Sequence, residues 1–281
     1  MLIGDNSQLA CDSDESVDTR FSFTDWERAS VQRLRLACLE KGIRYISLFE
    51  LVKYVLVVES SVQDSDEQAD AKRLQIALSR IQKRRAWEKR HGLDQIDGDV
   101  ALQQLLEAKP KYFAPTYLKD KEGHNVVGHN IAHSPPVGTK DKDSIYLAAE
   151  QRRWDLAAAD MNEARRGMAL VCVANGELTV SRAMRYLRLT LLARENLSDM
   201  HCNRIRRVYA EVPSFLTHFI SPAKRMLPRK INDRLTIVGN LAELEDSFIA
   251  EKDDALTLTA WMASRKAIHD ETLSKLTLDD L

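Results

Sequence analysis

The hydrophobic positions in the N-terminal third of the chain recur at helical spacing. Thr24 stands before a stripe that includes Val31 and Leu34, and Glu27, three residues later, completes a capping box. Gly42 follows this stripe at the position where helices often end in the left-handed conformation. Further helices are expected over Ile43–Val58, Ala71–Arg90 and Asp99–Ala108. Residues 21–108 are therefore predicted to form an N-terminal helical region, whereas residues 1–20 lack apolar periodicity and are predicted to be a disordered acidic arm.

The composition changes between residues 109 and 144, where four prolines and three glycines exclude a long helix. The tripeptide Gly-His-Asn at 123–125 recurs at 128–130. A small β-hairpin, an ordered functional loop and a flexible linker all fit such a sequence. We expect the segment to connect two regions, because a structureless stretch of this length is unusual inside one compact domain.

Helical spacing returns in residues 145–281. The helices expected here span Tyr146–Val173 (one helix or a pair), Thr179–Arg194, Asp199–Tyr209, Leu241–Ile249 and Leu256–His269. The predicted fold class is mainly α. An N-terminal and a C-terminal helical region are joined by a loop or small hairpin that contains proline, glycine and histidine.

Composition narrows the class of protein. The 281 residues are 44% hydrophobic and 30% charged, which is typical of a globular chain rather than a disordered one. No apolar run approaches the roughly 18 residues that a membrane-spanning helix requires. The longest run, Leu48–Val58, is interrupted by Glu50 and Lys53. The first twenty residues lack the pattern of a secretory signal, and the four cysteines are widely spaced, as suits reduced thiols. We therefore expect a cytoplasmic protein without a membrane partner.

The charges are unevenly distributed along a chain whose net charge is −1. Residues 72–91 hold eight Lys/Arg against one acid, and residues 180–235 hold twelve against four. The ends are acidic: residues 1–20 hold five acids against one arginine, and residues 236–281 hold ten acids against four basic residues. The two basic segments are compatible with a nucleic-acid partner, although opposite charges that pair on solvated helix faces would give the same pattern.

The strongest functional lead is the amphipathic helix expected at Thr179–Thr190. Its helical wheel has an apolar face of Val180, Ala183, Met184, Leu187 and Leu191, and an opposite face of Arg182, Arg185 and Arg188 flanked by Ser181 and Tyr186. Arginine can bind guanine or phosphate through two hydrogen bonds, while serine and tyrosine can contact the backbone of a nucleic acid. The string Thr-Val-Ser-Arg-Ala at 179–183 resembles the recognition helices of helix-turn-helix regulators, with Ala164–Val173 as the first helix. The turn between the two is longer than usual and Gly176 sits nearer the second helix, so the form expected is a variant or winged one.

Nucleic-acid contacts are predicted for this helix and for other basic residues of the two basic segments. The predicted contact residues are Ser181, Arg182, Arg185, Tyr186, Arg188, Arg204, Arg206, Arg207, Lys224, Arg225, Arg229 and Lys230, with Lys83, Arg84 and Arg85 from the first segment. If these residues converge, they engage several phosphates and make binding steeply dependent on salt.

A loop that contains histidines is the main lead toward catalysis. His124, His129 and His133 lie within ten residues, and neutral imidazoles bind zinc and similar metals. The carboxylates Asp120, Glu122 and Asp141 are close in sequence, but no recognised ligand spacing such as H-E-x-x-H is present. A polar surface loop, in which Asn125 and Asn130 make turn hydrogen bonds, is the preferred explanation of these histidines. No metal site and no cofactor is therefore assigned.

Three functions are compatible with a sequence that lacks the motifs of phosphate-binding loops and of hydrolase nucleophile elbows. The preferred one is non-catalytic binding of DNA or RNA by the C-terminal region, as a regulator or as a subunit of a nucleoprotein complex with other protein subunits. The first alternative is a helical adaptor whose basic faces dock an acidic partner. The second is a metal-dependent nuclease or hydrolase that uses the histidine loop.

Overall fold

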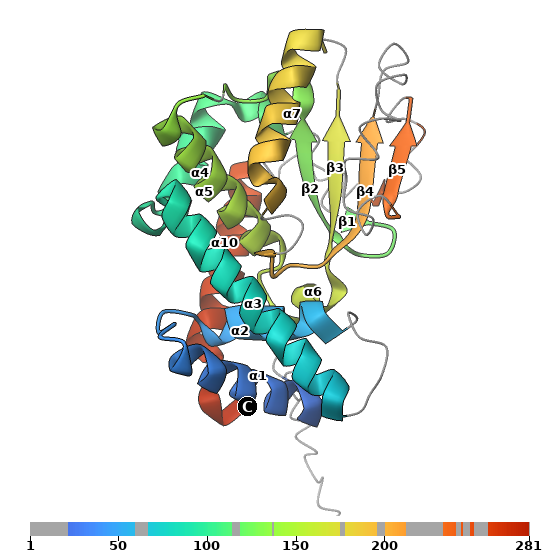
Figure 1. Cartoon of the computed structure of the whole chain (residues 1–281). Coiled ribbons are helices and arrows are strands. Elements are labelled where there is room, and N and C mark those ends of the chain that lie inside the picture. The colour runs from blue at the N-terminus through green and yellow to red at the C-terminus, as the bar shows by residue number, and fades with distance from the viewer. Residues whose placement is uncertain are drawn as a thin grey trace, which may run out of the picture.

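The computed structural model describes residues 22–59, 67–113, 119–136, 138–174, 178–195, 200–211, 233–239, 243, 248–249 and 258–280. The N-terminal region is helical, as predicted (Figure 1). Its helices are α1 (Asp25–Glu40), α2 (Leu48–Glu59), α3 (Glu67–His91) and α4 (Gly98–Ala108). The acidic arm predicted for residues 1–20 lies outside the described residues. Short 3-10 turns occur at Leu93–Gln95, Pro110–Phe113, Ile131–His133 and Leu278–Asp280.

The start and end of α1 follow the predicted local chemistry. The Thr24 hydroxyl accepts a hydrogen bond from the backbone N–H of Glu27, and the Glu27 carboxylate accepts one from the backbone N–H of Thr24 at 2.8 Å. Gly42 has a φ of +73°, which an L side chain rarely adopts. The capping box and the glycine stop are therefore confirmed.

Helix α2 is the centre of the N-terminal region. Eight of its twelve residues are buried, including Tyr54 and Leu56. It packs against α1, α3 and α6 (Met161–Arg166), and against α10 (Leu258–Lys275) near the C-terminus. A helix that is apolar nearly all round is stable only when other elements cover it on every side.

A six-stranded sheet corrects the predicted fold class. Its strands are β1 (Lys119–Asp120), β2 (Asn125–Asn130), β3 (Met168–Val173), β4 (Ile205–Glu211), β5 (Leu235–Val238) and β6 (Phe248–Ile249), in the order β5-β4-β3-β2-β1-β6. Strands β2 to β5 are parallel, and β1 is antiparallel to both of its neighbours. The chain combines helices with a mostly parallel sheet, so the mainly α prediction is wrong.

The strands were mistaken for helices because their side chains are apolar without alternation. All residues of β3 except Leu170 are buried, as expected for a central parallel strand with both faces covered. Such a run has no period of two that would distinguish it from a buried helix. The segment Ala164–Val173 therefore ends in β3 and supplies no first helix for a helix-turn-helix. The helix expected at Asp199–Tyr209 is likewise wrong, because β4 begins within it.

The predicted connection at 109–144 includes the hairpin that was one of its alternatives. Strands β1 and β2 pair in antiparallel fashion around a turn in which Gly123 has a φ of +80°. Strand β2 then continues along β3 in parallel register, so this stretch also contributes to the centre of the sheet.

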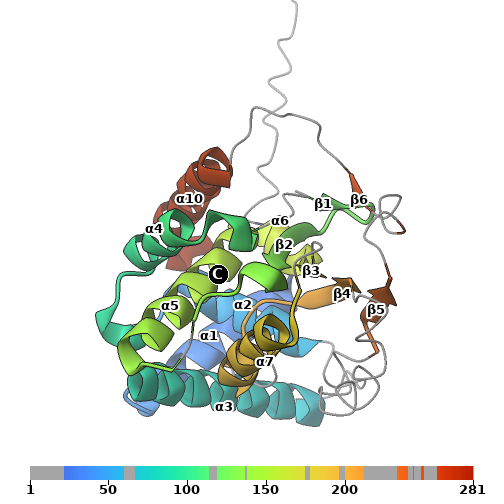
Figure 2. The same ribbon diagram turned by 90° about the horizontal axis from the view of Figure 1, so that it is seen from above.

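The connections between the parallel strands place helices on one side of the sheet. Helices α5 (Lys140–Ala157) and α6 link β2 to β3, and α7 (Val180–Glu195) lies between β3 and β4. Because consecutive strands are neighbours and such crossovers are right-handed, α5 and α7 lie on the same face (Figure 2). Helix α10 corresponds to the helix predicted at Leu256–His269 and packs against α5. Among the described helices, none combines the length and apolarity that crossing a bilayer would require.

Candidate functional site

A cleft of about 600 Å³ lies where the loop before α2 meets the end of α3 and the middle of α5. Its basic lining residues are Arg44, Arg85, Lys89 and Arg152. A smaller chamber of about 190 Å³ is lined by residues of α2, α3, α5 and α10. Arg85, Gln151 and Asp155 line both spaces, so the chamber adjoins the cleft.

The spacing of polar residues on the helices directs them toward this site. Glu50 and Lys53 are three residues apart on α2, so they lie on one face of an otherwise apolar helix. Gln151 and Asp155 are four residues apart on α5 and also share a face. These faces meet because α2 and α5 both pack against α3 and α10.

Glu88 of α3 joins the walls of the cleft. Its carboxylate accepts hydrogen bonds from Arg84 at 2.7 Å, from Arg85 at 2.8 Å and from Gln151 at 2.8 Å. Burial acts to raise the pKa of Glu88, but Arg84 and Arg85 outweigh it and hold the pKa below its ordinary value. Arg85 also donates to Glu50 at 2.8 Å, so Arg85 connects α3 to α2 while Glu88 connects α3 to α5.

The rim of the cleft carries an exposed aromatic ring. Tyr45 is 93% exposed, although its backbone oxygen accepts a hydrogen bond from Arg85 at 3.1 Å. The side chains of Arg44 and Lys89 are exposed on the same rim, and within the described part of the chain neither forms an ion pair. The rim therefore offers an exposed ring and one cation, Arg44, on a loop that Arg85 holds in place, and a second cation, Lys89, near the end of α3.

The inner chamber contains a buried lysine opposite an aspartate. The Lys53 side chain is 3% exposed, and its Nζ lies 3.6 Å from Asp155 Oδ1 and 4.5 Å from the centre of the Phe49 ring. Burial acts to raise the pKa of Asp155, but Lys53 and Arg84 hold it below its ordinary value. Lys53 and Asp155 thus face each other as charged groups, in a chamber that reaches the cleft past Gln151.

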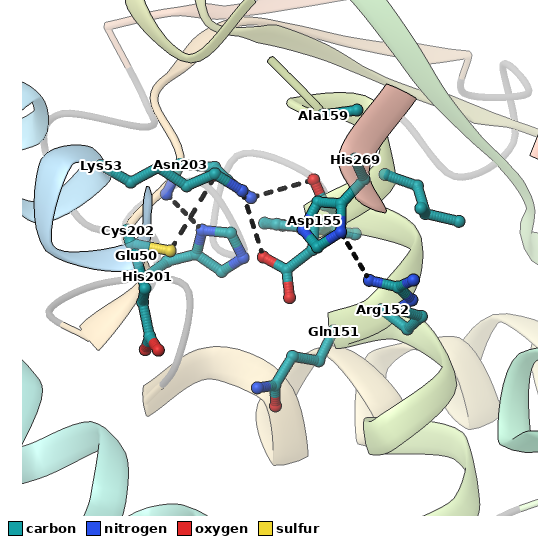
Figure 3. A network of polar contacts seen from close by, with 12 residues as sticks. Glu50, Lys53, Gln151, Arg152, Asp155, Ala159, His201, Cys202, Asn203 and His269 are labelled. Atoms are coloured by element: carbon teal, nitrogen blue, oxygen red, sulfur yellow. Dashed lines mark hydrogen bonds and ion pairs between the residues drawn. The ribbon is translucent and has the colours of Figure 1, made fainter. Parts of the chain in front are cut away.

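Two histidines from distant parts of the chain complete the chamber's surroundings (Figure 3). His201 Nδ1 accepts a hydrogen bond from the backbone N–H of Asn203 at 2.9 Å, and His269 Nδ1 lies 3.3 Å from Arg152. Burial lowers the pKa of His201 to about 3 and that of His269 to about 4. Both rings are therefore neutral at physiological pH.

Helix α7 forms as predicted, but its faces differ from the expected arrangement. Val180 is 66% exposed and Met184 48% exposed, so they do not form a buried face. The Tyr186 hydroxyl lies 3.0 Å from Cys172 Sγ of β3, and Arg185 reaches the backbone oxygen of Ser134 at 3.5 Å. Ser181 and Arg188 are exposed and Arg182 is half-buried. The side chains of Leu187 and Leu191 are outside the described set.

The other predicted basic residues do not gather around α7. Arg204 donates to Glu59 at 2.7 Å, Arg206 to the backbone oxygen of Arg166 at 3.2 Å, and Arg207 to Glu122 at 2.5 Å. Arg204, Arg206 and Arg207 lie at the start of β4. Ser181 and Arg182 come after the opposite end of β3, which runs parallel to β4. The six residues of β3 rise about 20 Å, so these two groups of residues lie at opposite ends of the sheet. The remaining four, Lys224, Arg225, Arg229 and Lys230, lie outside the described residues.

The three predicted contact residues of the first basic segment, all on α3, differ in their exposure to solvent. Arg84 is buried against Glu88, and Arg85 is half-buried in the cleft. Lys83 is exposed to solvent. Of the three residues predicted from this segment, only Arg85 therefore lines the 600 Å³ cleft.

The three histidines of the hairpin region do not come together. His124 Nδ1 lies 2.8 Å from Asp120, and His129 Nε2 lies 2.8 Å from Glu150 on α5. Five residues of extended chain separate them, a rise of about 17 Å. His133 is half-buried in the following turn. Across the described ranges, no three histidine, cysteine or acidic residues form a group that could hold a metal ion.

The sequence analysis missed the residues of the inner chamber. Glu50 and Lys53 were noticed only as interruptions of an apolar run, although two charges three residues apart on a buried helix must find partners. That signal could have identified Lys53. Nothing in the local pattern around Asp155, His201 or His269 indicates that they meet.

No model of a known family matches the chain, and no curated protein resembles it closely enough to count as a match.

Proposed function

We propose that the protein binds single-stranded nucleic acid in the cleft between the loop before α2, the end of α3 and α5, without catalysing a reaction on it. The observation that carries this proposal is the exposed Tyr45 ring on the rim, beside the two unpaired cations Arg44 and Lys89. An almost fully exposed aromatic ring gains nothing from the protein core, whereas it offers a stacking surface to an unpaired base.

The chemistry of the rim favours a single strand over a duplex. Bases stack on aromatic side chains with a gain of about 1–3 kcal/mol each, and lysine and arginine neutralise the phosphates that connect them. In a duplex the base faces are already stacked, so they cannot reach Tyr45 without being extruded. The cleft lies beside the rim and can receive a base or part of the backbone.

This proposal keeps the predicted class of partner and changes the surface. A regulator and a subunit of a nucleoprotein complex remain the roles proposed for such binding. The proposed location is the cytoplasm, because Cys38, Cys172 and Cys202 are free and buried, as expected of thiols in a reducing compartment.

Fluorescence anisotropy with short labelled oligonucleotides tests the proposal. We expect DNA or RNA single strands to bind more tightly than a duplex of the same sequence. Tyr45→Ala should weaken binding about tenfold, and Tyr45→Phe should retain most of it, since the ring supplies the stacking energy. Arg44→Ala and Lys89→Ala should each reduce the slope of log affinity against log salt by about 0.7.

Matched controls come from exposed cations elsewhere. Lys83→Ala lies on the same helix as Lys89, and Arg188→Ala lies on α7. Both variants should bind like the wild type. If Arg188→Ala weakens binding while Tyr45→Ala does not, the contact surface is α7 and the cleft proposal is wrong. The same conclusion follows if duplex and single strand bind equally well.

A further inference from the structure

The inner chamber holds three polar groups whose hydrogen-bonding capacity is unused. Lys53 Nζ lies 3.6 Å from Asp155, beyond hydrogen-bond distance, and no side-chain hydrogen bond of either residue occurs within the described ranges. Among the described residues, Gln151 Oε1 is buried without a hydrogen-bond partner, although its amide nitrogen donates to Glu88. All three residues line the same chamber.

A purely structural ion pair would look different. Charge-assisted N–H···O bonds close to about 2.7–2.9 Å, and the Arg84–Glu88 pair beside the chamber does so at 2.7 Å. Buried charges are stabilised only when hydrogen bonds satisfy their remaining donors and acceptors. Lys53 and Asp155 form a longer ion pair, 3.6 Å between Nζ and Oδ1, at the wall of a chamber of about 190 Å³, so the arrangement is suited to a ligand in the chamber that supplies the missing bonds.

The donors and acceptors that remain free in the chamber determine which hydrogen-bonding groups a complementary ligand presents. Lys53 offers donors, while the Asp155 carboxylate and Gln151 Oε1 offer acceptors. The complementary edge therefore presents one acceptor and two donors. Among the four common bases, guanine has this edge, with the O6 acceptor, the N1–H donor and the 2-amino donor; adenine, cytosine and uracil or thymine have different patterns.

The size and walls of the chamber fit a planar ring. A cavity of about 150 Å³ can hold benzene, so about 190 Å³ accommodates a base ring. Phe49 and Leu273 supply apolar lining, and the neighbouring His269 is neutral at physiological pH. Because Arg85, Gln151 and Asp155 line both spaces, the chamber adjoins the cleft in which the strand is proposed to bind.

We propose that the inner chamber is a guanine-binding site, in which Lys53 donates to O6 while Asp155 and Gln151 accept from N1–H and the 2-amino group. The site deepens the nucleic-acid function proposed above, since it takes one extruded base of the bound single strand. Reading the edge of an extruded base in a pocket is a recognised way to give a single-strand contact its base preference.

Free nucleosides test the chamber independently of the rim. In calorimetric titrations, guanosine should bind saturably to the wild-type protein, and inosine, which lacks the 2-amino group, should bind about tenfold more weakly. Adenosine and cytidine should not compete. Asp155→Asn should weaken guanosine binding and reduce the preference for guanosine over inosine, because the amide has one acceptor oxygen where the carboxylate has two. Lys53→Met should weaken both nucleosides, since both carry O6.

Two controls keep the outcomes distinct. Circular dichroism of each variant verifies folding, and Lys83→Ala, which changes an exposed residue that lines neither the cleft nor the chamber, should leave guanosine binding unchanged. Oligonucleotide binding without any guanosine binding, or equal affinities for guanosine and inosine, would overturn the guanine site and leave the rim proposal standing. Guanosine binding without oligonucleotide binding would support the chamber and overturn the nucleic-acid function.

Discussion

Replacing Glu88 with alanine removes the carboxylate that joins α3 to α5. Three hydrogen bonds end on this side chain, from Arg84, Arg85 and Gln151, and the Arg84 side chain is only 3% exposed. Truncating one member of a buried ion pair costs about 3–5 kcal/mol, because the remaining charge stays in a poorly solvated position. A typical domain is stable by only about 5–15 kcal/mol, so the variant should lose a large fraction of its free energy of unfolding.

Urea unfolding followed by circular dichroism measures this loss. The midpoint should fall while the slope stays constant, and Glu40→Ala, which changes an exposed glutamate of α1, should shift the free energy by less than about 0.5 kcal/mol. The double variant Arg84→Met with Glu88→Leu should be more stable than Glu88→Ala, since it removes both buried charges. A loss below about 1 kcal/mol for Glu88→Ala would refute the view that this carboxylate holds the walls of the cleft together.

The same prediction has a pH dependence with a defined sign. The pKa of Glu88 is lower in the folded chain than its ordinary value of 4.5. Its contribution to stability is therefore fully present above that value and is lost as the pH falls through the folded pKa. The difference in stability between wild type and Glu88→Ala should narrow below about pH 4.5.

Three further substitutions test other parts of the fold. Thr24→Ala should cost about 1 kcal/mol in a thermal melt, because it removes the hydroxyl that caps α1, whereas Thr24→Ser should cost little. Gly167→Ala should destabilise by about 1–3 kcal/mol in urea, since the glycine has a φ of +90° and an added Cβ would lie 2.8 Å from the backbone oxygen of Arg204; an unchanged midpoint would contradict this reading. Burial lowers the pKa of His201 to about 3 from its ordinary value of 6.5. Between pH 3 and pH 6.5 the imidazole therefore binds a proton in the unfolded chain but not in the folded chain, so the free energy of unfolding decreases as the pH falls through this range. His201→Leu should flatten that dependence by up to about 1.4 kcal/mol per pH unit, and an identical slope in both proteins would count against a neutral buried ring.

Elements whose chemistry is local can be predicted from the sequence. The capping box of Thr24 and Glu27, the glycine stop at Gly42, and the helical stripes of α3 and α4 were predicted correctly. A cap needs only a side chain and a backbone N–H three residues away, and a stripe needs only one face to be buried. These features are visible in a short window of sequence.

For the buried apolar runs, contacts with neighbouring segments determine whether a strand or a helix forms. The residues of β3 would fill a helical core equally well, and what makes them a strand is pairing with β2 on one side and β4 on the other. The sheet also determines which side of α7 is turned to solvent. The Tyr186 hydroxyl contacts Cys172 of β3, and Val180 and Met184 are therefore exposed.

The candidate site also depends on contacts between segments that are distant in sequence. Lys53 of α2, Asp155 of α5 and His269 of α10 are brought together by packing of the three helices around one chamber. The charge pattern located basic segments, but it could not distinguish Arg84, which is buried against Glu88, from Lys89, which remains exposed beside Tyr45. Charge is a property of the sequence, whereas burial and pairing set what that charge can bind, and both are properties of the folded chain.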